Sequence, residues 1–205
     1  MEQSRFKITP SHITGLIAVA ISAYFLITKR ADLSIVAASI YFMLACTTDT
    51  LKCKIPNLLN ACLLVVGIVL YTSNLGVPGL LLSLYGLGLG LALLLLPYLT
   101  GGIGAGDVKA LGALGALIGP YDLIQVFIYM GLYGGVLALL HYCYNTNIKN
   151  TIREAWLSVC AAALTRDVEY ALPKKPEARR TSMRFPYSAA IALGYYSFVY
   201  WGGLL

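Results

Sequence analysis

The chain has 205 residues, of which 59% are hydrophobic and only 12% are charged, and its formal net charge is +6. Soluble domains carry roughly 25% charged residues, whereas disordered chains are more polar and disulfide-rich secreted modules contain more cysteine. The composition therefore excludes these classes and a soluble nucleic-acid-binding protein, and it indicates a protein that crosses a membrane several times.

Uncharged apolar runs predict an all-α bundle of six or seven transmembrane helices, because about 20 apolar residues cross the bilayer core. Residues 55–106 contain no charge and must fold back once, and residues 72–79 (TSNLGVPG) are typical of such a turn. The fifth span is the shortest, since it starts at Asp107 and stops at Gly119 and Pro120. The expected spans are 8–28, 33–48, 58–71, 80–99, 107–118, 123–144 and 185–205.

We expect one integral membrane domain, residues 1–205, with a core formed by residues 31–144 and 184–205. Residues 1–30 add a helix that Lys29 and Arg30 close, which is not the pattern of a cleaved signal peptide. Residues 145–183 are polar, and within them residues 152–164 are typical of an amphipathic helix at the membrane surface.

The orientation follows from Lys and Arg, which accumulate on the cytoplasmic side of membrane proteins. With the N-terminus inside and seven crossings, thirteen of the fifteen basic residues face the cytoplasm, and only Lys29 and Arg30 lie outside. We therefore expect a cytoplasmic N-terminus and an external C-terminus in the inner (cytoplasmic) membrane. The basic residues of the 145–183 segment are expected to contact anionic lipid headgroups, not nucleic acid.

Acidic residues inside or beside membrane spans point to function, because a helix can cross the bilayer without them. Seven of the nine acids fall in polar segments or outer loops, and only Asp49 and Asp107 adjoin cytoplasmic ends of apolar runs. The topology places both at the same depth, where they can meet. The five cysteines form no CxxC pair and no metal-ligand spacing, so we expect neither a metal nor another cofactor.

The sequences that flank the two acids sharpen the expectation of a site. Asp107 follows a glycine-rich loop that includes Gly104 and Gly106, and irregular backbone at membrane depth survives only where it is buried or lines a watered cavity. Lys109 follows Asp107 closely. Asp49 is followed by Lys52 and Lys54, and then by Pro56 and Asn57, which can start the third helix.

Two carboxylates held together share a proton, so that one can act as an acid and the other as a base. The ionised member can then take a proton from water while the other protonates a peptide carbonyl, which hydrolyses the peptide without a metal or a covalent intermediate. Simpler interpretations remain: Asp107 can be a helix N-cap, and Asp49 an interfacial residue paired with Lys52 or Lys54. The glycines at 86, 90, 115, 119, 131 and 135 are explained by close helix packing.

Three blocks of residues resemble the type IV prepilin peptidases and the archaeal preflagellin peptidases, which are membrane aspartyl proteases of the GxGD type. Residues 49–57 (DTLKCKIPN) resemble the block that holds the family's first aspartate, and residues 104–111 (GAGDVKAL) resemble its GxGD block. Residues 185–194 (FPYSAAIALG), which contain Pro186, are similar to the proline-bearing block of the last helix.

The resemblance implies that Asp49 and Asp107 are the catalytic aspartates. It also implies that the chain removes short basic leaders, which usually end in glycine, from pilin-like precursors at the cytoplasmic face. Bifunctional members carry paired CxxC motifs in a domain that is associated with N-methylation. Nothing similar occurs here, so we do not expect methyltransferase activity.

Two other classes of function fit parts of the sequence. An ion- or proton-coupled transporter could use Asp49 and Asp107 as cation sites at a helix break, although it leaves their interfacial position and the Ile-Pro-Asn spacing unexplained. A membrane scaffold leaves both acids unexplained.

Overall fold

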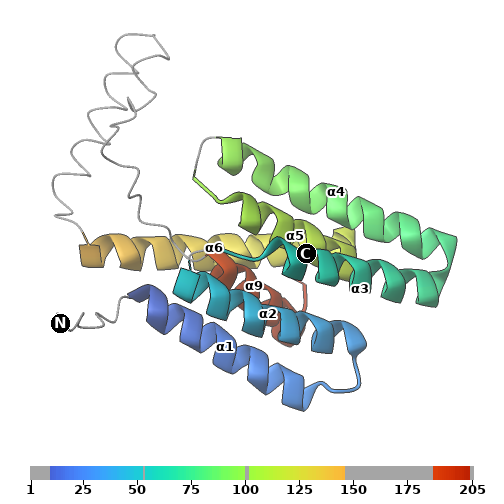
Figure 1. Cartoon of the computed structure of the whole chain (residues 1–205), viewed down its shortest axis with the longest axis horizontal. Coiled ribbons are helices and arrows are strands. Elements are labelled where there is room, and N and C mark those ends of the chain that lie inside the picture. The colour runs from blue at the N-terminus through green and yellow to red at the C-terminus, as the bar shows by residue number, and fades with distance from the viewer. Residues whose placement is uncertain (1–9, 53, 100–101, 146–186, 204–205) are drawn as a thin grey trace, which may run out of the picture.

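The computed structural model describes residues 10–52, 54–99, 102–145 and 187–203, and this part of the chain forms seven helices (Figure 1). The all-α class predicted from the sequence is confirmed. The helices are α1 (Pro10–Thr28), α2 (Leu33–Lys52), α3 (Asn57–Leu75), α4 (Val77–Leu99), α5 (Ala105–Ile118), α6 (Pro120–Asn145) and α9 (Tyr187–Trp201).

The chain is a multi-pass membrane protein. Among the described residues, α2, α3, α4 and α6 are long and apolar enough to cross a membrane, and α1 is a shorter apolar helix. Many large apolar side chains on their outer faces are exposed, including Leu16, Leu58 and Leu96. Such a surface suits a bundle that is surrounded by lipid, because lipid tails, unlike water, impose no penalty on exposed apolar side chains.

α5 is the buried helix of the bundle. It has 14 residues, which corresponds to a length of about 21 Å and falls short of the hydrocarbon core of roughly 30 Å. Every residue from Ala110 to Ile118 is buried, and α5 contacts α2, α3, α4, α6 and α9. A short apolar helix is stable here because its neighbours, and not lipid, surround it.

Glycines allow α4 and α5 to approach closely, as the small-residue spacing predicted. A Cβ atom at Gly86 would overlap the carbonyl oxygen of Gly115, and one at Gly90 would lie 2.6 Å from the carbonyl oxygen of Leu111. The packing explanation is wrong for two of the six glycines, because Gly131 and Gly135 are exposed and a Cβ atom at either would meet nothing within 4 Å. Gly119 packs against Tyr71 and also ends α5 with a φ of 84°.

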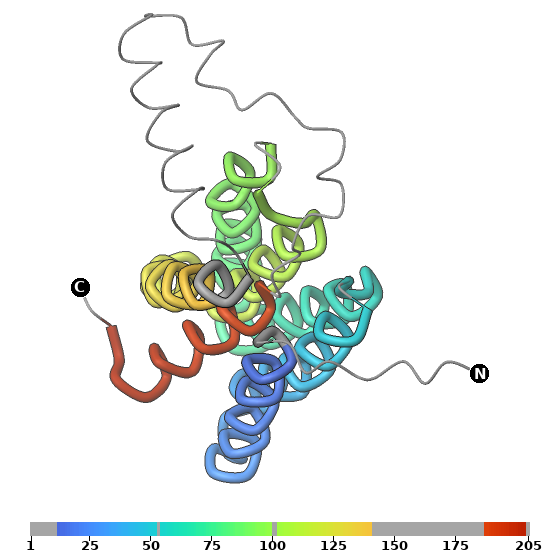
Figure 2. Tube along the Cα trace, turned by 90° about the vertical axis from the view of Figure 1, so that its left-hand side faces the viewer, coloured from blue at the N-terminus to red at the C-terminus, as the bar shows by residue number. Residues whose placement is uncertain are grey.

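One end of the bundle gathers the C-terminal ends of α2 and α4 with the N-terminal ends of α3, α5 and α9. This end lies on the left in Figure 1 and faces the viewer in Figure 2, where α1 and α4 lie on opposite sides. The additional helix α1 packs against α2 and α9. Gly15 lies against Thr50, and the ring of Phe25 stacks on that of Tyr196 at a centroid distance of 4.7 Å.

Two of the predicted helix boundaries were wrong, and the first of them changes where Asp49 lies. α2 does not stop at Thr48 but continues to Lys52, so that Asp49 lies inside its last turn. The broad turn expected at residues 72–79 is a single residue between helices, because Gly76 adopts a φ of 66° and reverses the chain at once. The expected amphipathic helix in the 145–183 segment and Pro186 lie outside the described residues.

The α4–α5 contact predicts that Gly86→Ala destabilises the protein. The added methyl group would overlap the Gly115 carbonyl, and overpacking costs about 1–3 kcal/mol. Thermal unfolding of the detergent-solubilised protein should show a lowered Tm. Gly88→Ala is the matched control, because a Cβ atom at Gly88 meets nothing within 4 Å. Equal Tm values for the two variants would contradict the packing argument.

Candidate functional site

Asp49 is a buried acid in the last turn of α2, with 8% of its surface exposed. Its Oδ2 atom accepts a hydrogen bond of 2.6 Å from the Ser188 hydroxyl and one of 3.4 Å from the Ser188 backbone N–H, both from the start of α9. Lys52 and Lys54 are exposed. Asp49 is therefore tied to another helix and is more than an interfacial acid beside two lysines.

Asp107 lies in the first turn of α5 and is half-buried. The N-cap residue is Gly104, not Asp107, and it makes no side-chain cap hydrogen bond. The Asp107 carboxylate lies against the backbone of Gly104, and the Asp107 N–H donates a hydrogen bond of 3.1 Å to the Gly104 carbonyl oxygen. The interpretation of Asp107 as the helix N-cap is therefore wrong, because Asp107 is the third residue of α5.

The structure brings the two acids into one electrostatic environment. Asp49 and Asp107 interact electrostatically although 58 positions separate them in the sequence. The hydroxyl of Tyr41, about two turns before Asp49 on α2, lies close enough to both carboxylates for their charges to act on it. Tyr187, at the start of α9, interacts with Asp107. Three helix ends and a buried tyrosine therefore surround the pair.

The N-terminal end of α3 fixes the position of the α5 N-terminus. The buried side chain of Asn60 accepts a hydrogen bond of 2.7 Å from the Tyr41 hydroxyl and donates one of 3.2 Å to the backbone carbonyl of Gly106. Gly106 also packs against Ile55 in the loop before α3. A single amide thus links α2, α3 and α5 beside Asp107.

The other residues predicted for the site have more peripheral positions. The Lys109 ammonium group donates a hydrogen bond of 3.1 Å to the Asn57 side-chain oxygen, and both residues are exposed. Pro56 is the N-cap residue of α3 and is exposed, as is Lys52. Lys109 therefore joins α5 to α3 at the surface of this end of the bundle.

Three residues that line the site were not singled out from the sequence, namely Tyr41, Asn60 and Ser188. Each is polar within an apolar helix, which is a usable signal, since such a residue needs a hydrogen-bond partner within the protein. Ser188 also belongs to the block at residues 185–194 that carried part of the resemblance. Among the described residues, no three His, Cys, Asp or Glu side chains gather as a metal ion would require.

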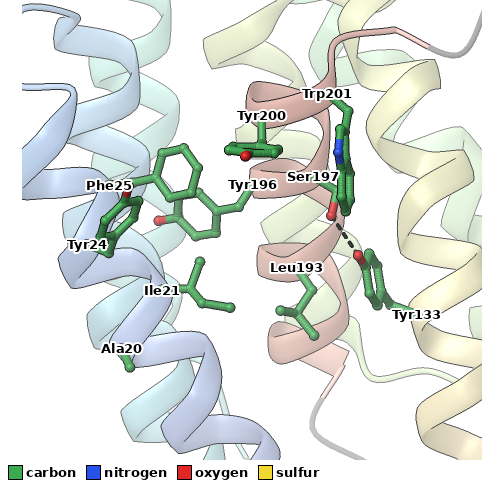
Figure 3. Close-up of a pocket in the computed structure, with 10 residues that line it drawn as sticks. All are labelled: Ala20, Ile21, Tyr24, Phe25, Tyr133, Leu193, Tyr196, Ser197, Tyr200 and Trp201. Carbon is green, nitrogen blue, oxygen red and sulfur yellow. Dashed lines mark hydrogen bonds between the residues drawn. The ribbon is translucent and has the colours of Figure 1, made fainter.

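Two hollows in the bundle are lined mainly by apolar side chains and by neither of the two carboxylates. Figure 3 shows one of about 440 Å³ between α1, α6 and α9, lined by apolar and aromatic side chains and by Ser197, which is hydrogen-bonded to Tyr133. None of the residues that line it is an acid. A second hollow, of about 350 Å³ between α2 and α3, is lined by Tyr41 but by neither Asp49 nor Asp107.

Comparison with known proteins gives one match. The model of the type IV leader peptidase family matches residues 35–139, which is half of the chain and includes Asp49, Asp107 and the helices between them. No curated protein and no solved structure showed significant similarity to the chain.

The amide link predicts that Asn60→Leu destabilises the protein much more than Asn57→Ala does. Removing Asn60 leaves the buried Tyr41 hydroxyl without its acceptor, which costs about 1–3 kcal/mol, whereas Asn57 and Lys109 are exposed and their hydrogen bond is open to water. Thermal unfolding of both purified variants measures the difference. A similar Tm for the two variants would mean that Asn60 does not tie the helices together.

Proposed function

Because the chain belongs to the type IV leader peptidase family, we propose that it is an aspartyl endopeptidase whose catalytic pair is Asp49 and Asp107. Family membership makes it a peptidase that acts on a protein substrate. The observation that carries the assignment of the two residues is their placement at one end of the bundle, Asp49 in the last turn of α2 and Asp107 in the first turn of α5. These two helices contact each other, and the hydrogen bonds from Tyr41 to Asn60 and from Asn60 to Gly106 link them beside Asp107. The family match also favours a peptidase over the ion-coupled transporter that the same two acids could serve.

The proposed reaction is hydrolysis of one peptide bond by an acid–base pair. The ionised carboxylate takes a proton from a water molecule, whose oxygen attacks the peptide carbonyl carbon, while the protonated carboxyl gives its proton to the carbonyl oxygen. The tetrahedral intermediate then collapses: its hydroxyl proton returns to the second carboxylate, the C–N bond breaks, and the first carboxyl protonates the leaving amine. Both residues regain their starting states, and no metal or covalent enzyme intermediate is needed.

The surroundings of the pair support such a reaction. Electrostatic effects are strong where water is scarce, and burial of Asp49 together with the apolar body of α5 limits the water around the pair. Gly104 and Gly106 leave room for a peptide chain near Asp107, since they have no side chains. Lys109, Asn57 and Asn60 keep the start of α5 in register with α3. Pro56 and Lys52 lie at the rim of the same end of the bundle.

The proposed substrates are pilin-like precursors, in which a short basic leader precedes an apolar helix. The scissile bond of such a precursor lies where the polar leader meets the membrane. Asp49 and Asp107 occupy a corresponding place, at the ends of apolar helices. We place this end at the cytoplasmic face, because thirteen of the fifteen basic residues fall on that side of the expected topology.

The catalytic assignment predicts that Asp49→Asn and Asp107→Asn each abolish cleavage. Loss of a general acid or base lowers the rate by about 10²- to 10⁴-fold. Cleavage can be measured in detergent micelles or liposomes with a synthetic peptide that has a basic leader ending in glycine, followed by an apolar helix.

Asp122→Asn is the matched control, because Asp122 occupies the first turn of α6 just as Asp107 occupies that of α5. It should cleave at the wild-type rate. All variants are compared at equal membrane-inserted amounts. Wild-type cleavage by either Asp49→Asn or Asp107→Asn would refute the pair, and equal losses in all three variants would show that a helix-end acid matters only for folding.

The proposed orientation predicts which loops a membrane-impermeant maleimide reaches in intact cells. In a background in which the five native cysteines are replaced, Arg30→Cys should be labelled from outside, because the α1–α2 loop is expected to be external. Lys54→Cys should be labelled only after permeabilisation. Labelling of Lys54→Cys in intact cells would invert the topology and move the carboxylates to the external face.

A further inference from the structure

Ser188 makes a direct side-chain hydrogen bond to Asp49. Its hydroxyl lies 2.6 Å from Asp49 Oδ2, a length typical of an O–H group that donates to an ionised carboxylate. Ser188 itself is 2% exposed and is the second residue of α9. Water therefore has little access to this contact, and its partners are set by the packing of α9 on α2.

We propose that Ser188 is a positioning residue that holds Asp49 as the ionised member of the pair, which makes Asp49 the general base and Asp107 the general acid. This inference rests on the proposed aspartyl mechanism and adds the division of roles that the mechanism leaves open.

The hydrogen bonds at Oδ2 carry the argument. The backbone N–H of Ser188 also points to Oδ2, at 3.4 Å, and an N–H group can only donate. Oδ2 is therefore an acceptor, and Oδ1 is the oxygen left to take a proton from water. A carboxylate this buried keeps its charge only where donors face it, and Ser188 supplies two of them.

Asp107 is held differently. Its carboxylate lies in the first turn of α5 against the backbone of the N-cap residue Gly104. Both acids therefore face a helix N-terminus, Asp49 that of α9 and Asp107 that of its own helix, so helix dipoles do not distinguish them. The buried hydroxyl at Asp49 does.

Other ionisable groups occur on the elements around the pair, and the test has to allow for them. Tyr41 and Cys46 on α2 and Tyr187 on α9 interact electrostatically with one carboxylate or both. At the same end of the bundle, α1 carries His12, α5 carries Lys109, and Lys52 and Lys54 flank the α2–α3 junction. None of these residues changes in the variants below.

The test is the pH dependence of kcat for Ser188→Ala, with the synthetic leader peptide as substrate. Without the hydroxyl, the ionised base is less stable and becomes protonated at higher pH. The acidic limb of the profile should move up by about one pH unit. At the optimum, kcat should fall roughly ten- to hundredfold with little change in KM. Ser188→Cys, which keeps a weaker donor of similar size, should lie between wild type and Ser188→Ala.

Ser197→Ala is the matched control. Ser197 is a buried serine on the same helix, and its hydroxyl lies 2.8 Å from that of Tyr133, away from the carboxylates. Its acidic limb should coincide with that of the wild type. The proposal is overturned if Ser188→Ala and Ser188→Cys keep the wild-type limb, or if Ser197→Ala shifts it equally. Cleavage by Asp49→Asn or Asp107→Asn would instead refute the aspartyl mechanism, so the two failures are distinguishable.

Discussion

In an apolar bundle, a buried polar side chain must find its partner within the protein, because lipid cannot supply one. This constraint determines how α5 is held. At its C-terminal end, the hydroxyl of Ser83 on α4 donates to the carbonyl of Ala116 at 2.8 Å, and that of Tyr71 on α3 donates to the carbonyl of Ile118 at 2.7 Å. At its N-terminal end, Asn60 donates to Gly106. Hydrogen bonds from neighbouring helices therefore fix both ends of the helix that carries Asp107.

The same constraint accounts for the contact between Asp49 and α9. An acid in the last turn of an apolar helix is tolerated when donors face it, and the start of α9 provides both a hydroxyl and a backbone N–H group. Glycines complement these bonds, since Gly67, Gly86 and Gly90 let the backbones of α3 and α4 approach α5. Close packing and polar contacts thus place α5 jointly, and the position of Asp107 relative to Asp49 follows from both.

Much of the fold could be predicted from the sequence, because the information was local. Uncharged runs predicted the seven helices that the described residues form, and Gly119 with Pro120 ended α5 where expected. The end of α2 could not be predicted in this way. Residues 49–52 (DTLK) are polar enough to suggest a loop, and the helix continues because Thr50 packs against Gly15 and Asp49 against Ser188. Those contacts come from residues that are far away in the sequence.

The candidate site shows the same division between local and distant information. Asp49 lies near the end of α2 and Asp107 near the start of α5, and two complete helices separate them. An even number of crossings returns the chain to the same side, so the alternation of helices alone gives the two acids a common depth. It gives Asp122 the opposite depth, although Asp122 occupies the same position in its own helix as Asp107.

Depth does not determine which helices are neighbours. Tyr41, Asn60 and Ser188 lie at the site because α2, α3 and α9 pack against α5, and only the three-dimensional arrangement shows this packing. Helix order therefore brings the acids to one level of the membrane, and the polar contacts across α2, α3, α5 and α9 turn that shared level into a site.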